Sequence, residues 1–293
     1  MTHALDPLGP APRGSWCGYG VRVARRAGRH RGICSPHSVC TSRFCARRNN
    51  GELVVLHDLS PDELCDELAV ILADELDAPG TLLRGQRDFE LVFTGIVRST
   101  VDGALPAWLR FYRNSLDRLA DGTASFSPIH EHAAALLMGR QLVDLGSCFG
   151  FFALRAVDLG MEVTATDLSQ PTMDLLARLS PLLRRQLRTI GCDAAHVPLP
   201  DRSADTVTAL HLIEHLTPAA ADDVLDEAIR LARRRVIVAV PFEDEPRACY
   251  GHVQAFNTAS LRRLGSKLCG RHPSLVVSVH EHRGGWLVID RTI

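Results

Sequence analysis

The sequence predicts an α/β fold, in which a mainly parallel sheet in the C-terminal half follows a helical extension. Three observations lead to this prediction. From Gln141 onward, short apolar runs alternate with helical segments. Between residues 51 and 139, apolar residues instead recur at helical spacing. Residues 1–50 show neither pattern. The chain therefore divides into three predicted regions: 1–50, 51–139 and 140–293.

The first region is rich in arginine and cysteine. It contains nine Arg and one acidic residue, Asp6, a composition that favours a disordered basic arm. A start of translation near Gly51–Val55 is an alternative explanation. A metal site is not predicted, because the Cys and His residues of this region lack the paired C-x2-C spacing of zinc sites. These residues are Cys34, His37, Cys40 and Cys45.

The second region is predicted to be helical. Ser60 and Glu63 match a capping box, with Pro61 at the first helical position, and this helix is expected to stop at Pro79–Gly80. Further helices are expected over residues 88–101, after Pro106 and over 128–138. The apolar face of the helix after Pro106 would consist of Leu109, Phe111, Tyr112, Leu116 and Leu119. This pattern predicts a packed helical region, and by itself it points to no particular function.

Six apolar runs in the third region are predicted strands. They cover residues 142–145, 162–166, 206–210, 236–240, 275–280 and 286–290. Their alternation with helical stretches predicts βαβ units and a mainly parallel sheet with helices on both faces. The carboxyl ends of the strands, and with them the binding site, are then expected at one edge. Gly284 and Gly285 predict a hairpin and an antiparallel last strand.

The turn after the first of these strands has the features of a cofactor site. Residues Val143–Gly150 read V-D-L-G-S-C-F-G, and Gly146 and Gly150 permit a sharp turn and close approach of a cofactor to the backbone. The dinucleotide fingerprint G-x-G-x-x-G is absent, which disfavours a nicotinamide dehydrogenase. Asp167 ends the second strand, 23 residues after Asp144, where an acid can accept hydrogen bonds from both hydroxyls of a ribose.

Three further segments complete a pattern with this turn. They are Gly191–Asp201, Ala204–Leu216 and Tyr250–Leu261. In order and spacing, the motifs over about residues 140–265 resemble those of class I methyltransferases of type 11, which depend on S-adenosyl-L-methionine (SAM). Cys148 replaces the middle glycine of that family's first motif, which puts the strength of cofactor binding in doubt. The resemblance implies a Rossmann-like fold with a seven-stranded sheet, and SAM as the cofactor.

The resemblance also assigns cofactor contacts. Asp167 would bind the ribose, Asp193 the adenine amino group and Leu168 one face of the adenine, while His211 would line the methionine side. The full predicted set is Asp144, Gly146, Ser147, Gly150, Asp167, Leu168, Asp193, Ala194 and His211. For each acid, a role in capping a turn or in a solvated loop is the alternative.

Methyl transfer from a sulfonium is an SN2 displacement, so the protein mainly has to align the reactants and exclude water. A general base is needed when the acceptor is a hydroxyl. His215 and His252, just beyond the fourth and fifth strands of the family pattern, are the predicted catalytic residues; ordering of their loops is the alternative. Glu214 and His215 supply only two ligands, so no metal is predicted.

The acceptor is the least determined part of the prediction. Helices before the first strand resemble the lids of class I methyltransferases, which makes Tyr112, Asn114 and His130 candidate acceptor contacts; packing of surface helices is the alternative. The turn 145–150 and the helix 111–119 resemble an actinobacterial group that O-methylates the oligosaccharide of the redox cofactor mycofactocin. We therefore expect a hydroxyl of a small molecule or a glycan as the acceptor.

Composition bounds the remaining possibilities. The net charge of −1 indicates no general nucleic-acid or membrane partner, and no run of eighteen apolar residues exists. Nine scattered cysteines are typical of a reducing cytoplasm. The oligomeric state is not predicted.

Two other functions stay open. One is a nucleic-acid methyltransferase that uses the Arg-rich segment for phosphate contacts, although His211–Leu216 stands where such enzymes carry N/D-P-P-Y/F. The other is a non-catalytic SAM-binding scaffold, which the retained Asp144, Asp167 and Asp193 disfavour.

Overall fold

The chain consists of two compact units. The computed structural model describes residues 5–26, 38–77 and 82–291. The C-terminal unit comprises residues 126–247 and the chain from 252 onward, and the N-terminal unit comprises residues 5–125 and 248–251. The expected boundary between residues 139 and 140 differs from this division, because helix α4 (Ser127–Leu136) belongs to the unit of the sheet that follows it.

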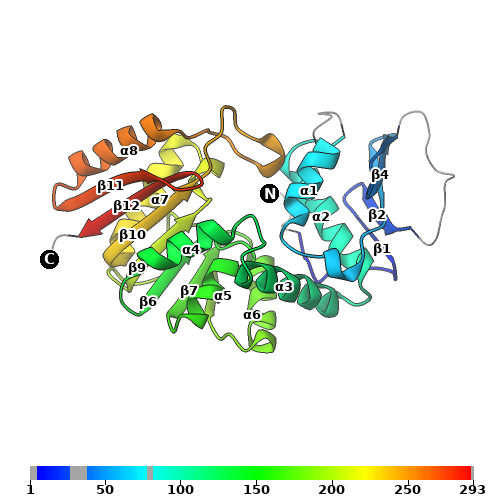
Figure 1. Cartoon of the computed structure of the whole chain (residues 1–293), viewed down its shortest axis with the longest axis horizontal. Coiled ribbons are helices and arrows are strands. Elements are labelled where there is room, and N and C mark those ends of the chain that lie inside the picture. The colour runs from blue at the N-terminus through cyan, green and yellow to red at the C-terminus, as the bar shows by residue number, and fades with distance from the viewer. Residues whose placement is uncertain (1–4, 27–37, 78–81, 292–293) are drawn as a thin grey trace. The chain divides into compact units, whose positions relative to one another are not determined.

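A seven-stranded, mainly parallel sheet lies at the centre of the C-terminal unit (Figure 1). The strand order is β11-β12-β10-β9-β6-β7-β8, with β12 antiparallel to both of its neighbours. The strands are β6 (Gln141–Leu145), β7 (Glu162–Asp167), β8 (Arg188–Gly191), β9 (Ala204–Leu210), β10 (Ala232–Val240), β11 (Leu275–Glu281) and β12 (Gly285–Arg291). The predicted fold class and antiparallel last strand are confirmed. β8 was not predicted, because its four residues contain no apolar run.

Helices cover both faces of this sheet. α7 and α8 share a buried core with β6, β9, β10 and β12, while α5 and α6 pack along β6, β7 and β8. Figure 1 shows α4 and α5 on the side of the sheet opposite to α8. The helices are α5 (Phe151–Asp158), α6 (Gln170–Leu179), α7 (Pro218–Leu231) and α8 (Thr258–Arg271), with short 3₁₀ turns η3 (Pro181–Leu183) and η4 (Ile213–His215). Because the strands β6 to β10 are parallel, their carboxyl ends meet at one edge.

The N-terminal unit contains a second sheet, which corrects the prediction of a disordered arm over residues 1–50. The strand order is β1-β2-β5-β4-β3, with β2 and β5 parallel and the other pairs antiparallel. The strands are β1 (Ser15–Gly18), β2 (Val21–Arg25), β3 (Val39–Cys40), β4 (Phe44–Asn49) and β5 (Glu52–His57). Val21 and Val23 alternate with exposed or half-buried residues on β2, as Leu53 and Val55 do on β5. The high arginine content had obscured this period of two.

Two features of the first region concern its cysteines and its start. Cys40 and Cys45 lie opposite each other on β3 and β4, with their Cα atoms 4.2 Å apart, a contact that the sequence did not predict. Cys34 and His37 lie outside the described residues. A chain starting near Gly51–Val55 would keep β5 but lose the four strands beside it.

Helices complete the N-terminal unit. The capping box is confirmed, since Glu63 Oε2 accepts hydrogen bonds from Ser60 N at 2.8 Å and Ser60 Oγ at 2.9 Å. The single helix expected after it is instead divided into short turns. The elements are η1 (Pro61–Glu63), α1 (Leu68–Leu72), the π-helical turn η2 (Ala73–Asp77), α2 (Gln86–Thr100), α3 (Ala104–Ala120) and η5 (Ala248–Tyr250). α2 packs on β1 and β2, and a Cβ at Gly95 would meet Val23 Cγ2 at 2.4 Å, so this contact requires glycine.

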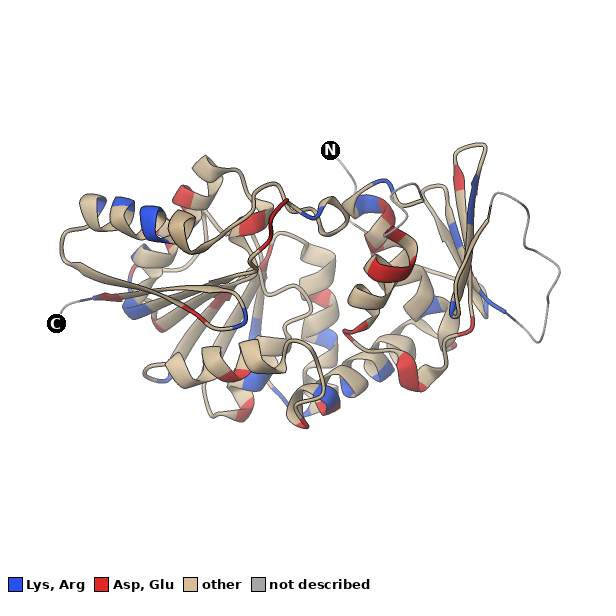
Figure 2. Cartoon of the chain, turned by 45° about the horizontal axis from the view of Figure 1, so that its top comes forward, with Lys and Arg blue, Asp and Glu red and all other residues tan. Residues whose placement is uncertain are grey.

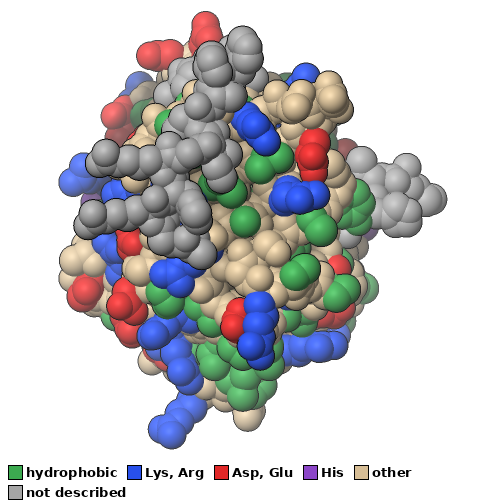
Figure 3. All heavy atoms as spheres, turned by 90° about the vertical axis from the view of Figure 1, so that its right-hand side faces the viewer, with side chains coloured by type: hydrophobic (Ala, Val, Ile, Leu, Met, Phe, Trp, Pro, Cys, Tyr) green, Lys and Arg blue, Asp and Glu red, His purple; other side chains and the backbone are tan. Residues whose placement is uncertain are grey.

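Acidic residues of the N-terminal unit pair with arginines of the first region. The ion pairs are Arg22–Glu52, Arg26–Asp58, Arg43–Glu75 and Arg48–Asp88. Figure 2 shows basic and acidic residues on this sheet and its helices, and Figure 3 shows both signs of charge across the visible face. This pairing leaves less free positive charge than the composition indicated. Among the described residues, no helix is both long and apolar enough to span a membrane.

Candidate active site

The turn between β6 and α5 is built around positive-φ residues. Gly146 (φ 65°) and Gly150 (φ 72°) adopt the left-handed region, as does Cys148 (φ 50°). A Cβ on Gly146 would meet Leu212 Cδ1 at 2.6 Å, and one on Gly150 would meet Leu176 Cδ2 at 2.4 Å. Both glycines are therefore required by conformation and by space. The turn also leaves Cys148 exposed at the edge of the sheet.

Asp144 is buried at the carboxyl end of β6. Its Oδ1 accepts a hydrogen bond from Thr208 Oγ1 at 2.6 Å, and its carbonyl oxygen accepts one from Ser147 Oγ at 2.9 Å. Burial raises the pKa of Asp144 to about 6, against the lowering effect of these hydroxyls. These hydrogen bonds therefore join Asp144 to β9 and hold Ser147, in the turn, to the end of β6.

Asp167 ends β7 beside the same turn. Its Oδ2 accepts a hydrogen bond from Cys148 N at 2.9 Å and its Oδ1 one from Ser169 N at 2.8 Å. Burial raises the pKa of this carboxyl, while those two backbone donors and the nearby His215 lower it. Leu168, the next residue, is 81% exposed, so its side chain is accessible to a ligand bound at this edge. The structure thus brings Asp167 and Leu168 to the glycine turn.

Asp193 and Ala194 follow the short strand β8. Asp193 is exposed, and its Oδ1 accepts a hydrogen bond from Ala195 N at 2.9 Å, while Ala194 is half-buried against the core. The backbone of Cys192 donates to Asp167 O at 2.9 Å, which ties this loop to the end of β7. The predicted cofactor residues other than His211 therefore follow three adjacent strands, β6, β7 and β8, at one edge.

A group of histidines and acids follows β9 at the same edge. His211 has a positive φ of 54°, and its Nδ1 lies 3.3 Å from Glu214 Oε1. Glu214 and His215 lie in the turn η4, and the rings of His215 and His252 are 4.8 Å apart. The two predicted catalytic histidines, which are far apart in sequence, are therefore neighbours.

His130 lies on α4 beside this group. Its ring packs between Phe126 and Phe152, at centroid distances of 6.4 Å and 5.5 Å, and Phe126 also contacts His211 at 5.3 Å. Burial, followed by Arg155 and His211, lowers the pKa of His130 to about 3, so this imidazole is neutral at physiological pH.

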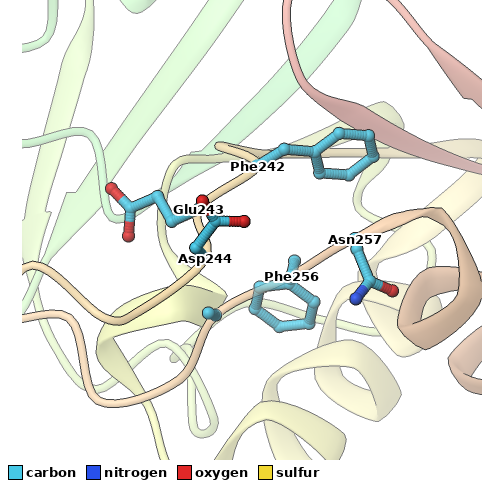
Figure 4. A pocket seen from close by; sticks show the side chains of 6 residues that line it. Phe242, Glu243, Asp244, Phe256 and Asn257 are labelled. Carbon is cyan, nitrogen blue, oxygen red and sulfur yellow. The ribbon is translucent and has the colours of Figure 1, made fainter.

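Beyond β10, the structure adds residues that the sequence analysis did not single out. Phe242, Glu243, Asp244 and Asn257 line a cleft of about 350 Å³ together with Ala255 and Phe256. Figure 4 shows the Glu243 carboxylate pointing away from the Phe242 ring, and Glu243 Oε2 lies 2.7 Å from His252 Nδ1. The sequence contained a signal for these residues, because residues 242–244 lie just after Pro241 at the carboxyl end of the parallel strand β10.

Two candidate acceptor contacts have structural roles instead. Tyr112 is fully buried in the N-terminal unit. Asn114 Nδ2 donates hydrogen bonds to Pro61 O and Leu64 O, both at 2.9 Å. Helical spacing had already placed Tyr112 on the apolar face of α3, whereas the contact of Asn114 could not be predicted because the position of residues 61–64 was not known. The structure thus buries Tyr112 and uses the amide of the half-buried Asn114 for contacts with the backbone of residues 61–64.

Comparison with known proteins agrees with this geometry. Residues 143–240, about a third of the chain, match a family model described as a methyltransferase domain. No curated protein matches the sequence.

Solved structures similar to the chain include three methyltransferases. A SAM-dependent methyltransferase from Aquifex aeolicus is 15% identical, with a TM-score of 0.44, over 60% of this chain and 97% of that one. The magnesium protoporphyrin IX methyltransferase of Synechocystis with bound SAM is 17% identical (TM-score 0.44; 76% and 97% covered). A Burkholderia thailandensis 1,6-didemethyltoxoflavin-N1-methyltransferase is 20% identical (TM-score 0.46; 62% and 87% covered).

Residues 143–240 of the C-terminal unit match a methyltransferase domain. The sheet of this unit, mainly parallel with one antiparallel strand, has the topology of the Rossmann-like fold of class I methyltransferases.

Proposed function

We propose that this protein transfers the methyl group of SAM to a hydroxyl of a small-molecule or glycan acceptor. The observation that carries the proposal is the meeting of two groups of residues at one sheet edge. His215 is close enough to the predicted ribose ligand Asp167 to act on its pKa, and His252 lies against His215. Groups suited to handling an acceptor proton thus adjoin the proposed cofactor site.

Methyl transfer from SAM requires few protein groups beyond those that align the reactants and accept a proton. The acceptor oxygen attacks the methyl carbon of SAM in line with the sulfonium, a C–O bond forms, and the electron pair of the broken C–S bond goes to sulfur to give neutral S-adenosylhomocysteine (SAH). The hydroxyl proton has to leave around the time of attack. In the proposed site His215 and His252 meet the acceptor hydroxyl, and His130, Phe126 and Phe152 help to exclude water.

The cleft beyond β10 supports a polyhydroxylated acceptor. Phe242 and Phe256 supply ring faces, and Asp244 and Asn257 supply groups that can bind hydroxyls. We propose the oligosaccharide of mycofactocin as the first acceptor to test, and the cytoplasm as the place of the reaction. The helical region 51–139 is proposed to act as a lid over the acceptor.

The test uses the full-length protein with SAM and pools of oligosaccharides and small hydroxyl compounds. SAH formation measures turnover, and mass spectrometry locates the methyl group. Transfer to a carbohydrate hydroxyl supports the proposal. Transfer only to nucleic acid would favour the alternative of a nucleic-acid methyltransferase. Binding of SAM without turnover on any acceptor would favour a non-catalytic scaffold.

A further inference from the structure

We propose that Glu214, His215 and His252 bind one divalent transition-metal ion at the acceptor side of the SAM site. This inference rests on the proposed function, because the ion would act on the acceptor hydroxyl. Each residue offers one ligand atom, and these atoms lie within 4.8 Å of one another. Two imidazoles and one carboxylate form a donor set that suits first-row transition metals better than magnesium.

Glu214 is the second, independent observation. Its side chain is only 1% exposed, and neither carboxylate oxygen has a hydrogen-bond partner among the described residues. A buried carboxylate without such partners is costly, since it has lost water and gained little in return. His211 Nδ1, 3.3 Å from Oε1, gives partial compensation at most. A bound cation would satisfy this carboxylate.

The two segments that carry the ligands are tied together by hydrogen bonds. Glu214 O accepts hydrogen bonds from Val253 N at 2.9 Å and Gln254 N at 3.3 Å. Gln254 Nε2 donates to Ile213 O and Leu216 O, both at 2.8 Å. The turn after β9 and the loop after η5 therefore hold a fixed separation, so the three ligands are positioned before an ion arrives.

His252 has the outer contact typical of a metal ligand. Its Nδ1 lies 2.7 Å from Glu243 Oε2, and the two side chains are 7% and 13% exposed. A carboxylate that accepts a hydrogen bond from one ring nitrogen orients the ring and leaves the other nitrogen free to ligate a metal. Glu243 is therefore a positioning residue in this proposal, with Nε2 of His252 facing the ion.

The ion would take the place of a histidine as the group that activates the acceptor hydroxyl. A bound Lewis acid lowers the pKa of a coordinated hydroxyl, so that the acceptor gives its proton to water and its oxygen attacks the SAM methyl group. No oxidant or further reactant is needed, because the sulfonium already supplies the leaving group. The histidines then act as ligands instead of taking the proton themselves.

The first experiment measures metal binding without turnover. Full-length protein treated with chelator and then freed of it is titrated calorimetrically with Mn²⁺ and with Zn²⁺, and Mn²⁺ binding is followed by electron paramagnetic resonance. We expect one ion per chain. Glu214→Gln and His252→Ala should each weaken binding by about 100-fold or more, and Glu243→Gln by about 10-fold.

The matched control is His132→Ala. His132 belongs to a separate histidine group, with its Nε2 2.7 Å from His280 Nε2, and its loss should leave metal affinity unchanged. SAH titration of every variant checks that the domain is folded. Metal binding that is unchanged in Glu214→Gln and His252→Ala, or absent in protein that binds SAH, overturns the metal site. Failure to bind SAH by folded wild-type protein overturns the proposed function instead.

Discussion

The two units use their polar side chains differently. In the N-terminal unit, Arg98 Nη1 donates to Pro7 O and Gly9 O, Trp108 Nε1 donates to Pro7 O, and Asn114 holds the segment 61–64. These side chains tie loops to helices. In the C-terminal unit, the ends of parallel strands instead bring acids, histidines and glycines to one edge. This difference supports the proposal that the chemistry takes place in the C-terminal unit.

The largest expected effect is on cofactor binding. Asp167→Ala should lower the affinity for SAM by about 100-fold, because two charge-assisted hydrogen bonds to the ribose are lost. Calorimetric titration measures this, with the exposed Asp174→Ala as the control at a neighbouring helix. Normal SAM affinity in the Asp167 variant would contradict the prediction that Asp167 binds the ribose. It would also weaken the proposal that the chemistry takes place in the C-terminal unit.

The next effect is on the glycine turn. Gly146→Ala should destabilise the protein by about 2–3 kcal/mol, since the new Cβ both strains the backbone and meets Leu212. Gly160→Ala is the matched control, because Gly160 also has a positive φ (82°) but a Cβ there would meet no atom within 4 Å; about 1 kcal/mol is expected for this variant. Equal losses in urea unfolding would show that close packing at the turn does not matter.

Acid should destabilise both units by the same mechanism. Burial lowers the pKa of His57 to about 3 in the N-terminal unit and that of His130 to about 3 in the C-terminal unit. The unfolded chain, with histidine near pKa 6.5, then binds more protons than the native state between about pH 6.5 and pH 3. The stability that these neutral histidines contribute is complete above about pH 6.5 and falls as the pH drops through this window, by at most about 2 kcal/mol per histidine at pH 5.

Single replacements sharpen this prediction. His57→Asn and His130→Asn should each reduce the loss of stability between pH 7 and pH 5 in urea unfolding. The exposed His196→Asn should not change it. An unaltered slope in both buried variants would contradict the assignment of neutral native histidines.

The smallest effect is expected at α3. Asn114→Ala should destabilise the protein by about 1–2 kcal/mol through loss of two hydrogen bonds, while SAM affinity and the KM for the acceptor stay unchanged. Thermal unfolding and steady-state kinetics measure the two quantities. A raised KM with unchanged stability would show that Asn114 contacts the acceptor. That result would contradict the purely structural role of Asn114 in the N-terminal unit.

The sequence predicted the parts of the fold that rest on local patterns. Strands β6, β7, β9 and β10 were predictable from apolar runs, and Asp144, Asp167 and Gly146 from their positions at strand ends. β8 was missed because Arg188–Gly191 has no apolar run, and the second sheet because arginines mask its alternation. The meeting of Glu214 with His252 was also beyond sequence reasoning, since it depends on how two distant loops are tied together.

The central claim is that the edge of the C-terminal sheet binds SAM. Calorimetric titration of the full-length protein with SAM and with SAH tests it most directly. We predict one site per chain and micromolar dissociation constants for both compounds. Absence of binding by either compound, in protein shown to be folded by circular dichroism, would contradict the claim and leave a methyltransferase fold without its cofactor.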